Sequence, residues 1–100
     1  MTDRSRSIDN LQTALAMELT AVNQYLLHAH TLDDWGLDKL AQRMRDEMQE
    51  ELTHAGRFAD RIIFLGGTPR MTPKKTPAMA SGLAELFEAD KTEEQGAIEF

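Results

Sequence analysis

Apolar residues recur every three or four positions over residues 7–32, which predicts one long helix there. The apolar stripe comprises Ile8, Leu11, Leu15, Val22, Tyr25, Ala29 and Leu32. Its spacing is unbroken only if position 18 belongs to it, although that residue is a glutamate. The sequence Asp33-Asp34-Trp35-Gly36 then ends the helix, because glycine readily adopts the backbone conformation of a helix terminus.

A second stripe predicts a helix over residues 37–65, and a third stripe predicts a helix over residues 82–100. The apolar members of these two stripes are Leu37, Leu40, Met44, Phe58, Ile62 and Leu65, followed by Leu83, Leu86, Phe87, Ala97 and Ile98. Residues 66–81 hold all three prolines and show no periodicity, so we expect a loop. No period of two indicates a strand. The chain is therefore expected to form one all-α domain over residues 1–100.

Two long helices joined by a short turn form an antiparallel hairpin, with each helix about 40 Å long. Such a hairpin cannot bury both of its apolar faces alone and needs further helices to close a bundle. The third segment is too short to be a full-length partner. The pattern therefore favours association with other chains.

Three ionisable residues occupy positions that the apolar stripes would reserve for the core. Glu18 lies between Leu15 and Val22 in the first helix, and Glu51 and His54 lie within the stripe of the second. Buried carboxylates without a partner are costly. A sequence that directs several of them inward is typical of a protein that binds a cation.

The spacing of these three residues suits a metal site. Glu51 and His54 are three positions apart, which places both side chains on one face of a helix. Glu18 and Glu51 lie equally far from the predicted turn, so an antiparallel hairpin puts them at nearly the same height. Carboxylate and imidazole ligands together favour iron, manganese or zinc. A lone Glu-x-x-His pair is common without a metal, so the prediction depends on this match in height.

A short internal repeat adds a fourth carboxylate. The first helix reads ELTAV from Glu18 and the third reads EQGAI from Glu94, so both carry a Glu-x-x-Ala-aliphatic pattern. Glu94 also falls in an apolar stripe. By contrast, His28 and His30 lie beside polar residues near the end of the first helix, and we expect both to face the surface or a loop.

The composition narrows the function further. The chain has 11 Lys+Arg against 17 Asp+Glu and a net charge of −6, which argues against nucleic-acid binding because that requires a basic surface. The absence of cysteine excludes disulfides, iron–sulfur clusters and thiolate metal sites. No apolar run approaches the roughly 20 residues of a membrane helix, and the N-terminus lacks the apolar region of a secretory signal. We therefore expect a cytoplasmic protein without a membrane partner.

Three segments carry a more specific pattern, which reads MELTAVNQYLLHA, DDWGLDKLAQ and EELTHAGRFADRIIFLGGTP. Over residues 8–69, without gaps, the chain resembles the first two helices of bacterioferritin, and residues 83–100 resemble the start of its third helix more weakly. The resemblance implies a ferritin-like bundle that binds Fe(II) at a di-iron centre. It also implies oxidation of that iron by O₂ or peroxide and storage of the ferric product in a hollow shell.

Carried over by position, the resemblance implies a role for four residues. Glu18 and His54 would be terminal iron ligands, Glu51 would bridge the two irons, and Glu94 matches the carboxylate of the third helix. The protein would then be a ferroxidase whose partners are Fe(II) and further copies of itself.

The sequence departs from the family in lacking a fourth helix with a second Glu-x-x-His. Two copies about a two-fold axis would each contribute Glu18, Glu51 and His54, restoring four glutamates and two histidines. That arrangement resembles the encapsulated ferritins and would complete a four-helix bundle by dimerisation. The alternative is a non-catalytic fragment of a longer ferritin.

A second departure concerns haem. The haem ligand of the family is a methionine directly after the bridging glutamate, where this chain has Leu52. Met48 lies one turn earlier on a similar face and is the candidate for cofactor binding, which would make the protein a haem-binding helical dimer. A methionine on an apolar stripe more often packs in the core. Haem is therefore an alternative and not the predicted cofactor.

Overall fold

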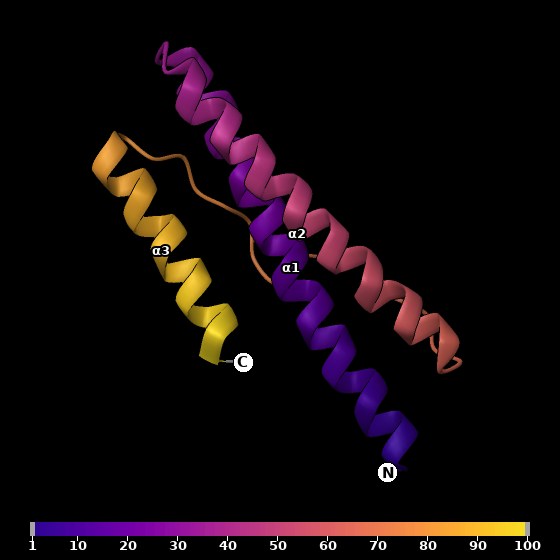
Figure 1. The fold of residues 1–100 in the computed structure, drawn as a ribbon. Coiled ribbons are helices and arrows are strands. Elements are labelled where there is room, and N and C mark those ends of the chain that lie inside the picture. Colours follow the sequence, from indigo (N-terminus) through magenta and orange to yellow (C-terminus); the bar gives the residue numbers. More distant parts are fainter. Residues whose placement is uncertain (1, 100) are drawn as a thin grey trace.

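The computed structural model describes residues 2–99, with side chains as far as residue 93, and contains three helices (Figure 1). The helices are α1 (Asp3–Asp34), α2 (Asp38–Phe64) and α3 (Leu83–Glu99). No strand occurs in this part of the chain, so the predicted all-α fold is confirmed. The molecule is elongated, with extents of 50 × 20 × 18 Å, because α1 and α2 pair along most of their length.

A glycine in the left-handed conformation ends each of the two long helices. Gly36 has a φ of 78° and Gly66 has a φ of 88°. After Gly36, the N–H of Leu37 donates back to the carbonyl of Leu32 at 2.8 Å, which is the bond of a Schellman motif. The same pattern of bonds follows Gly66. The first motif reverses the chain between α1 and α2, and the second ends the hairpin.

α1 begins four residues before the start that the apolar stripe predicts. Thr2 is the N-cap, and its side chain accepts a hydrogen bond from the N–H of Ser5 at 3.1 Å. Asp3 adds a negative charge in the first turn, where the helix dipole favours it. These first turns carry no apolar residue before Ile8, so the stripe alone does not reveal them.

The hairpin buries two separate apolar clusters. The turn-side cluster joins α1 and α2 near their connection, and the far cluster joins them towards the N-terminus of α1. The buried members are Tyr25, Ala29, Leu32, Ala41, Met44, Ala80 and Leu86 in the turn-side cluster, and Leu15, Ala55 and Ile62 in the far cluster. Between the two clusters lies the stretch of hairpin that carries Glu18 and Glu51.

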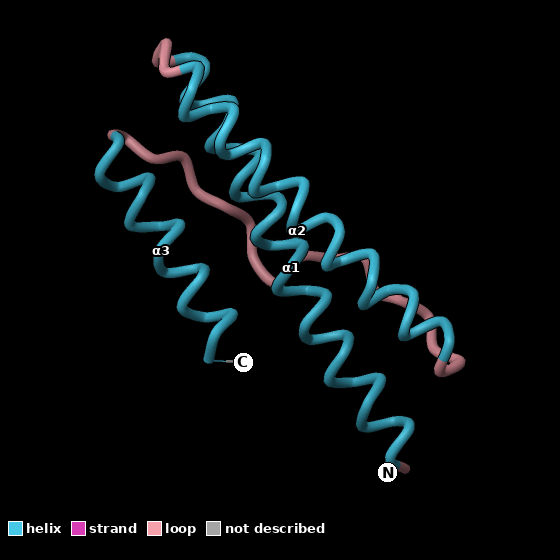
Figure 2. The backbone as a smooth tube through the Cα atoms, in the orientation of Figure 1, coloured by secondary structure: helices cyan, strands magenta, loops and turns pink. Residues whose placement is uncertain are grey.

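Residues 65–82, which we call the strap, run back along α1 (Figure 2). The amide side chain of Gln12 holds the strap twice, because its oxygen accepts from the N–H of Arg70 at 2.9 Å and its nitrogen donates to a strap carbonyl at 2.8 Å. Further along, the hydroxyl of Thr20 accepts from the N–H of Lys74 at 2.8 Å. α1 therefore buries a polar face against the strap as well as an apolar face against α2.

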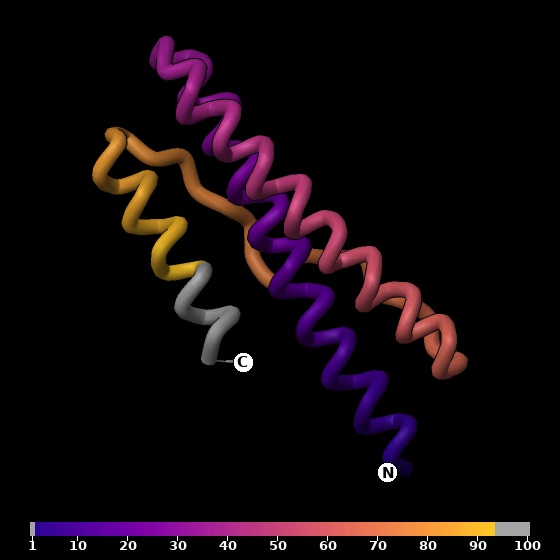
Figure 3. The backbone as a smooth tube through the Cα atoms, viewed as in Figure 1, coloured from indigo at the N-terminus to yellow at the C-terminus, as the bar shows by residue number. Residues whose placement is uncertain are grey.

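α3 runs antiparallel to α1 on the side away from α2 (Figure 3). Leu86 anchors it, with no exposed surface, in the turn-side cluster. Within the described chain, no Cα atoms of α2 and α3 come within 8 Å of one another, so the flank of α2 is open on this side. None of the described helices is long and apolar enough to cross a membrane.

Two glycine substitutions test the terminus of α2. Gly66→Ala should lower the free energy of unfolding by about 1 kcal/mol, because alanine is strained at a positive φ. Gly56→Ala, inside α2 with open space around the added methyl group, should raise it by up to about 1 kcal/mol. Urea denaturation followed by circular dichroism measures both. Equal effects of the two substitutions would contradict the assigned role of Gly66.

Candidate metal centre

The structure brings Glu18, Glu51 and His54 together in the middle of the hairpin. The Nδ1 atom of His54 lies 3.8 Å from Oε2 of Glu18 and 3.6 Å from Oε2 of Glu51. One ligand atom from each residue can be chosen so that all three lie within 4.8 Å of one another. In the described chain, this is the group of acidic and histidine residues with the geometry to hold a metal ion.

The three side chains are only partly accessible to water. Their exposed fractions are 17% for Glu18, 21% for Glu51 and 39% for His54. The Oε2 atom of Glu18 is buried without a hydrogen-bond partner among the described residues. Burying a carboxylate oxygen in this way costs free energy unless a cation or donor compensates it.

The separations between these atoms match ligands of one cation better than they match hydrogen bonds. Both contacts of His54 Nδ1 are longer than a hydrogen bond. Ligand atoms bound at about 2.1 Å from a metal ion lie roughly 3–4 Å apart around it. Two carboxylates and one imidazole are a donor set for iron, manganese or zinc.

Comparison with known proteins agrees with this arrangement. The family model of the ferritin-like domain matches residues 8–100. The chain belongs to the ferritin-like family. It is 40% identical over 90 residues to the bacterioferritin of Brucella melitensis and 43% identical over 83 residues to a bacterial ferritin of Pseudomonas aeruginosa. These matches cover 90% and 83% of this chain.
 A solved structure of Rhodobacter capsulatus bacterioferritin matches this ferritin-like chain with a TM-score of 0.91 and 36% identity. The match covers 99% of this chain and 62% of the other. That protein is described as having a metal-free dinuclear site and a haem iron in a crystallographic special position. The chain spans 56% and 53% of the two curated relatives, so it corresponds to about half of their length.

Two of the predicted site residues do not join the group in the described structure. The side chain of Glu94 lies outside the described residues, so its role stays a sequence prediction. Met48 is half-buried and packs against the turn-side cluster, which fits a core residue. Leu52, at the position of the family's haem ligand, is 40% exposed and has no donor atom. These residues do not fit haem, and we derive no step from it.

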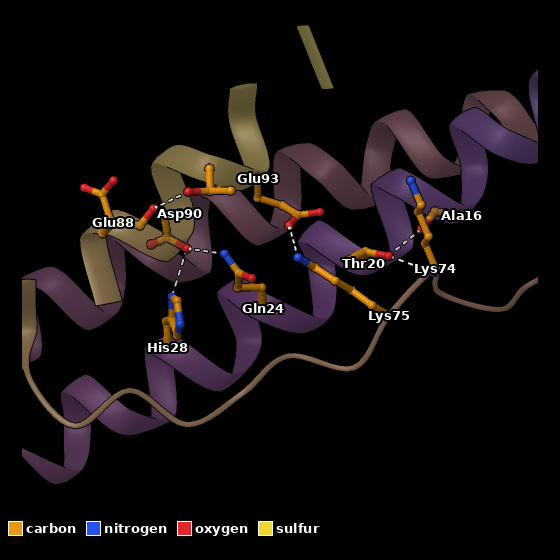
Figure 4. Close-up of polar contacts among 10 residues, drawn as sticks. Ala16, Thr20, Gln24, His28, Lys74, Lys75, Glu88, Asp90 and Glu93 are labelled. Carbon is orange, nitrogen blue, oxygen red and sulfur yellow. Dashed lines mark hydrogen bonds and ion pairs between the residues drawn. The ribbon is translucent and has the colours of Figure 1, made fainter. Parts of the chain in front are cut away.

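The structure of this ferritin-like chain also contains a buried polar cluster that sequence reasoning missed (Figure 4). His28 is only 1% exposed, so the expectation that it faces the surface or a loop is wrong, whereas His30 is exposed as expected. Nδ1 of His28 lies 2.9 Å from Oδ1 of Asp90 in α3, and Gln24 donates to the same oxygen at 3.0 Å. The spacing of Gln24 and His28 four residues apart is the signal that could have revealed this second face of α1.

The cost of the unpartnered carboxylate predicts a change in stability. In metal-free protein, Glu18→Gln should raise the free energy of unfolding by about 1 kcal/mol, because it removes a buried charge and keeps the shape. Urea denaturation in the presence of a chelator measures this change. The exposed neighbour of Glu51 provides the control, since Glu50→Gln should change stability little. Loss of stability in Glu18→Gln would show that Glu18 has a partner in the metal-free protein.

Proposed function

We propose that this chain supplies one half of a dinuclear centre that oxidises Fe(II) for iron storage. The observation that carries the proposal is the buried, unpartnered Oε2 of Glu18 within reach of Glu51 and His54. The relatives named bacterioferritin and the dinuclear site described in one of them support iron as the metal. Manganese or zinc would bind the same donors, so activity with iron is the test.

The three residues have distinct tasks in this proposal. Glu51 bridges two iron ions, while Glu18 and His54 each bind one iron at the edge of the pair. Carboxylates attract Fe(III) more strongly than Fe(II), because the attraction grows with the charge on the metal. The ligands therefore favour loss of an electron from each iron. The two electrons reduce O₂ to hydrogen peroxide with uptake of two protons, or reduce peroxide to water.

Three ligands cannot satisfy two iron ions, so another helix must complete the centre. α3 covers α1, and the flank of α2 beside the 39% exposed His54 is open among the described residues. A helix that docks on this flank would bring further carboxylate or imidazole ligands to the iron. We propose a second copy of the chain as its source, so that the site is shared between two chains.

The position of α3 sets a condition on a symmetric pair of chains. For each hairpin to face the other directly, the partner hairpin must lie along α1 where α3 now lies. α3 would then leave that place and break the contact between His28 and Asp90. If α3 stays, only one helix fits beside α2, and that helix belongs to a longer chain or to a differently arranged copy.

Iron oxidation separates the ligand from its neighbour. Glu51→Ala should reduce the initial rate of Fe(II) oxidation by at least about a hundredfold, because it removes the bridging ligand. Glu50→Ala, which removes an exposed carboxylate one position earlier, should keep the rate of the unchanged chain. Stopped-flow absorbance of ferric product measures both. Equal rates in the two variants would rule out this assignment of the centre.

Native mass spectrometry after anaerobic addition of Fe(II) tests the shared site. An even oligomer with two irons for each pair of chains is the expected result, because the ligands of two chains form one centre. A monomer without bound iron would show that this chain alone is non-catalytic and that a longer ferritin supplies the missing helix. Glu51→Ala is the control, since its oligomers should carry no iron pair.

A further inference from the structure

The strap and the N-terminal half of α1 enclose a groove that the proposed iron chemistry does not use. Its volume is about 780 Å³. Arg70, Thr72 and Lys74 line the strap side, and residues of α1 line the other side. Alternate residues of an extended segment point in the same direction, which is why these three side chains share one wall.

The strap is held in place without using these side chains. The N–H of Arg70 donates to the side chain of Gln12, and the N–H of Lys74 donates to the hydroxyl of Thr20. Figure 4 shows Lys74 beside Thr20 and Ala16, with its side chain extended along α1. Both anchors are backbone groups, so the guanidinium and the ammonium remain available to a ligand.

The two cations of the groove have no ion-pair partner among the described residues, although the chain carries a net charge of −6. Lys75, the next residue, behaves differently because its Nζ lies 3.4 Å from Oε2 of Glu93. Asp9 lines the groove on α1 but does not pair with either cation. Two unpaired cations on one wall favour an anionic ligand along the strap.

We propose that this groove binds a chain of linked phosphates, such as inorganic tripolyphosphate, with Arg70 and Lys74 holding different phosphates. Arginine and lysine are the side chains that proteins use for phosphate. The hydroxyl of Thr72, between the two cations, donates to the phosphate between them. Asp9 on the opposite wall repels the ligand and keeps it along the strap.

The spacing of the cations argues for linked phosphates over a single one. Four residues of extended chain separate Arg70 from Lys74 by up to about 13 Å between backbone positions. A single phosphate that contacts both cations draws two long side chains together, which costs conformational entropy. Linked phosphates contact each cation where it stands, and the second contact adds to the first within one molecule.

Calorimetric titration of the metal-free chain at low salt tests the proposal. Tripolyphosphate should bind saturably, with one ligand for each chain, and about tenfold more tightly than inorganic phosphate. Arg70→Ala and Lys74→Ala should each weaken tripolyphosphate binding about fivefold. Asp9→Asn should tighten it, because it removes the repelling carboxylate. Since no iron is present, the result is independent of the proposed iron oxidation.

Lys75→Ala is the matched control, because it removes the same charge next to Lys74 from a side chain outside the groove. It should leave the affinity within about twofold of the unchanged chain. Absence of saturable binding would overturn the proposal. Equal weakening by Lys75→Ala and Lys74→Ala would overturn it too, because net charge and not the groove would then hold the anion. Equal affinity for phosphate and tripolyphosphate would reject the linked ligand.

Discussion

The register between α1 and α2 is the constraint on which the candidate metal centre depends. Gly36 reverses the chain so that Glu18 in α1 comes within a few ångströms of His54 in α2. A shift by one residue would rotate a ligand by about 100° around its helix and remove it from the group. The apolar clusters on both sides hold this register, and the ligands lie between them with one buried carboxylate oxygen unpartnered.

α1 organises the rest of the chain because it is buried on more than one side. Its apolar face packs on α2, while its polar side chains hold the strap and α3 through Gln12, Thr20, Gln24 and His28. α3 therefore lies on α1 and leaves α2 uncovered on the side of the ligands. The polar face of α1 thus decides where an additional helix can reach the candidate centre.

The sequence was sufficient for the features that depend on helical periodicity. The three helices, the glycine at the end of each long helix and the approach of Glu18 to Glu51 and His54 follow from spacing and from the length on either side of the turn. The strap did not follow, because an irregular segment held by side chains of another helix has no repeating pattern.

The burial of His28 was missed for a related physical reason. A histidine beside polar neighbours reads as exposed, and its partner Asp90 lies in a different helix far along the chain. Only the fold brings the two residues together. The early start of α1 was missed because the cap at Thr2 acts through the backbone, before any apolar residue marks the helix.

X-ray absorption spectroscopy at the iron edge, on the chain loaded anaerobically with Fe(II) and then exposed to O₂, tests the central claim most directly. The account predicts oxygen and nitrogen ligands and a second iron at about 3.5–4 Å or closer, held by the bridging carboxylate of Glu51. Isolated iron without a neighbouring iron or an imidazole ligand would contradict a dinuclear centre built on Glu18, Glu51 and His54.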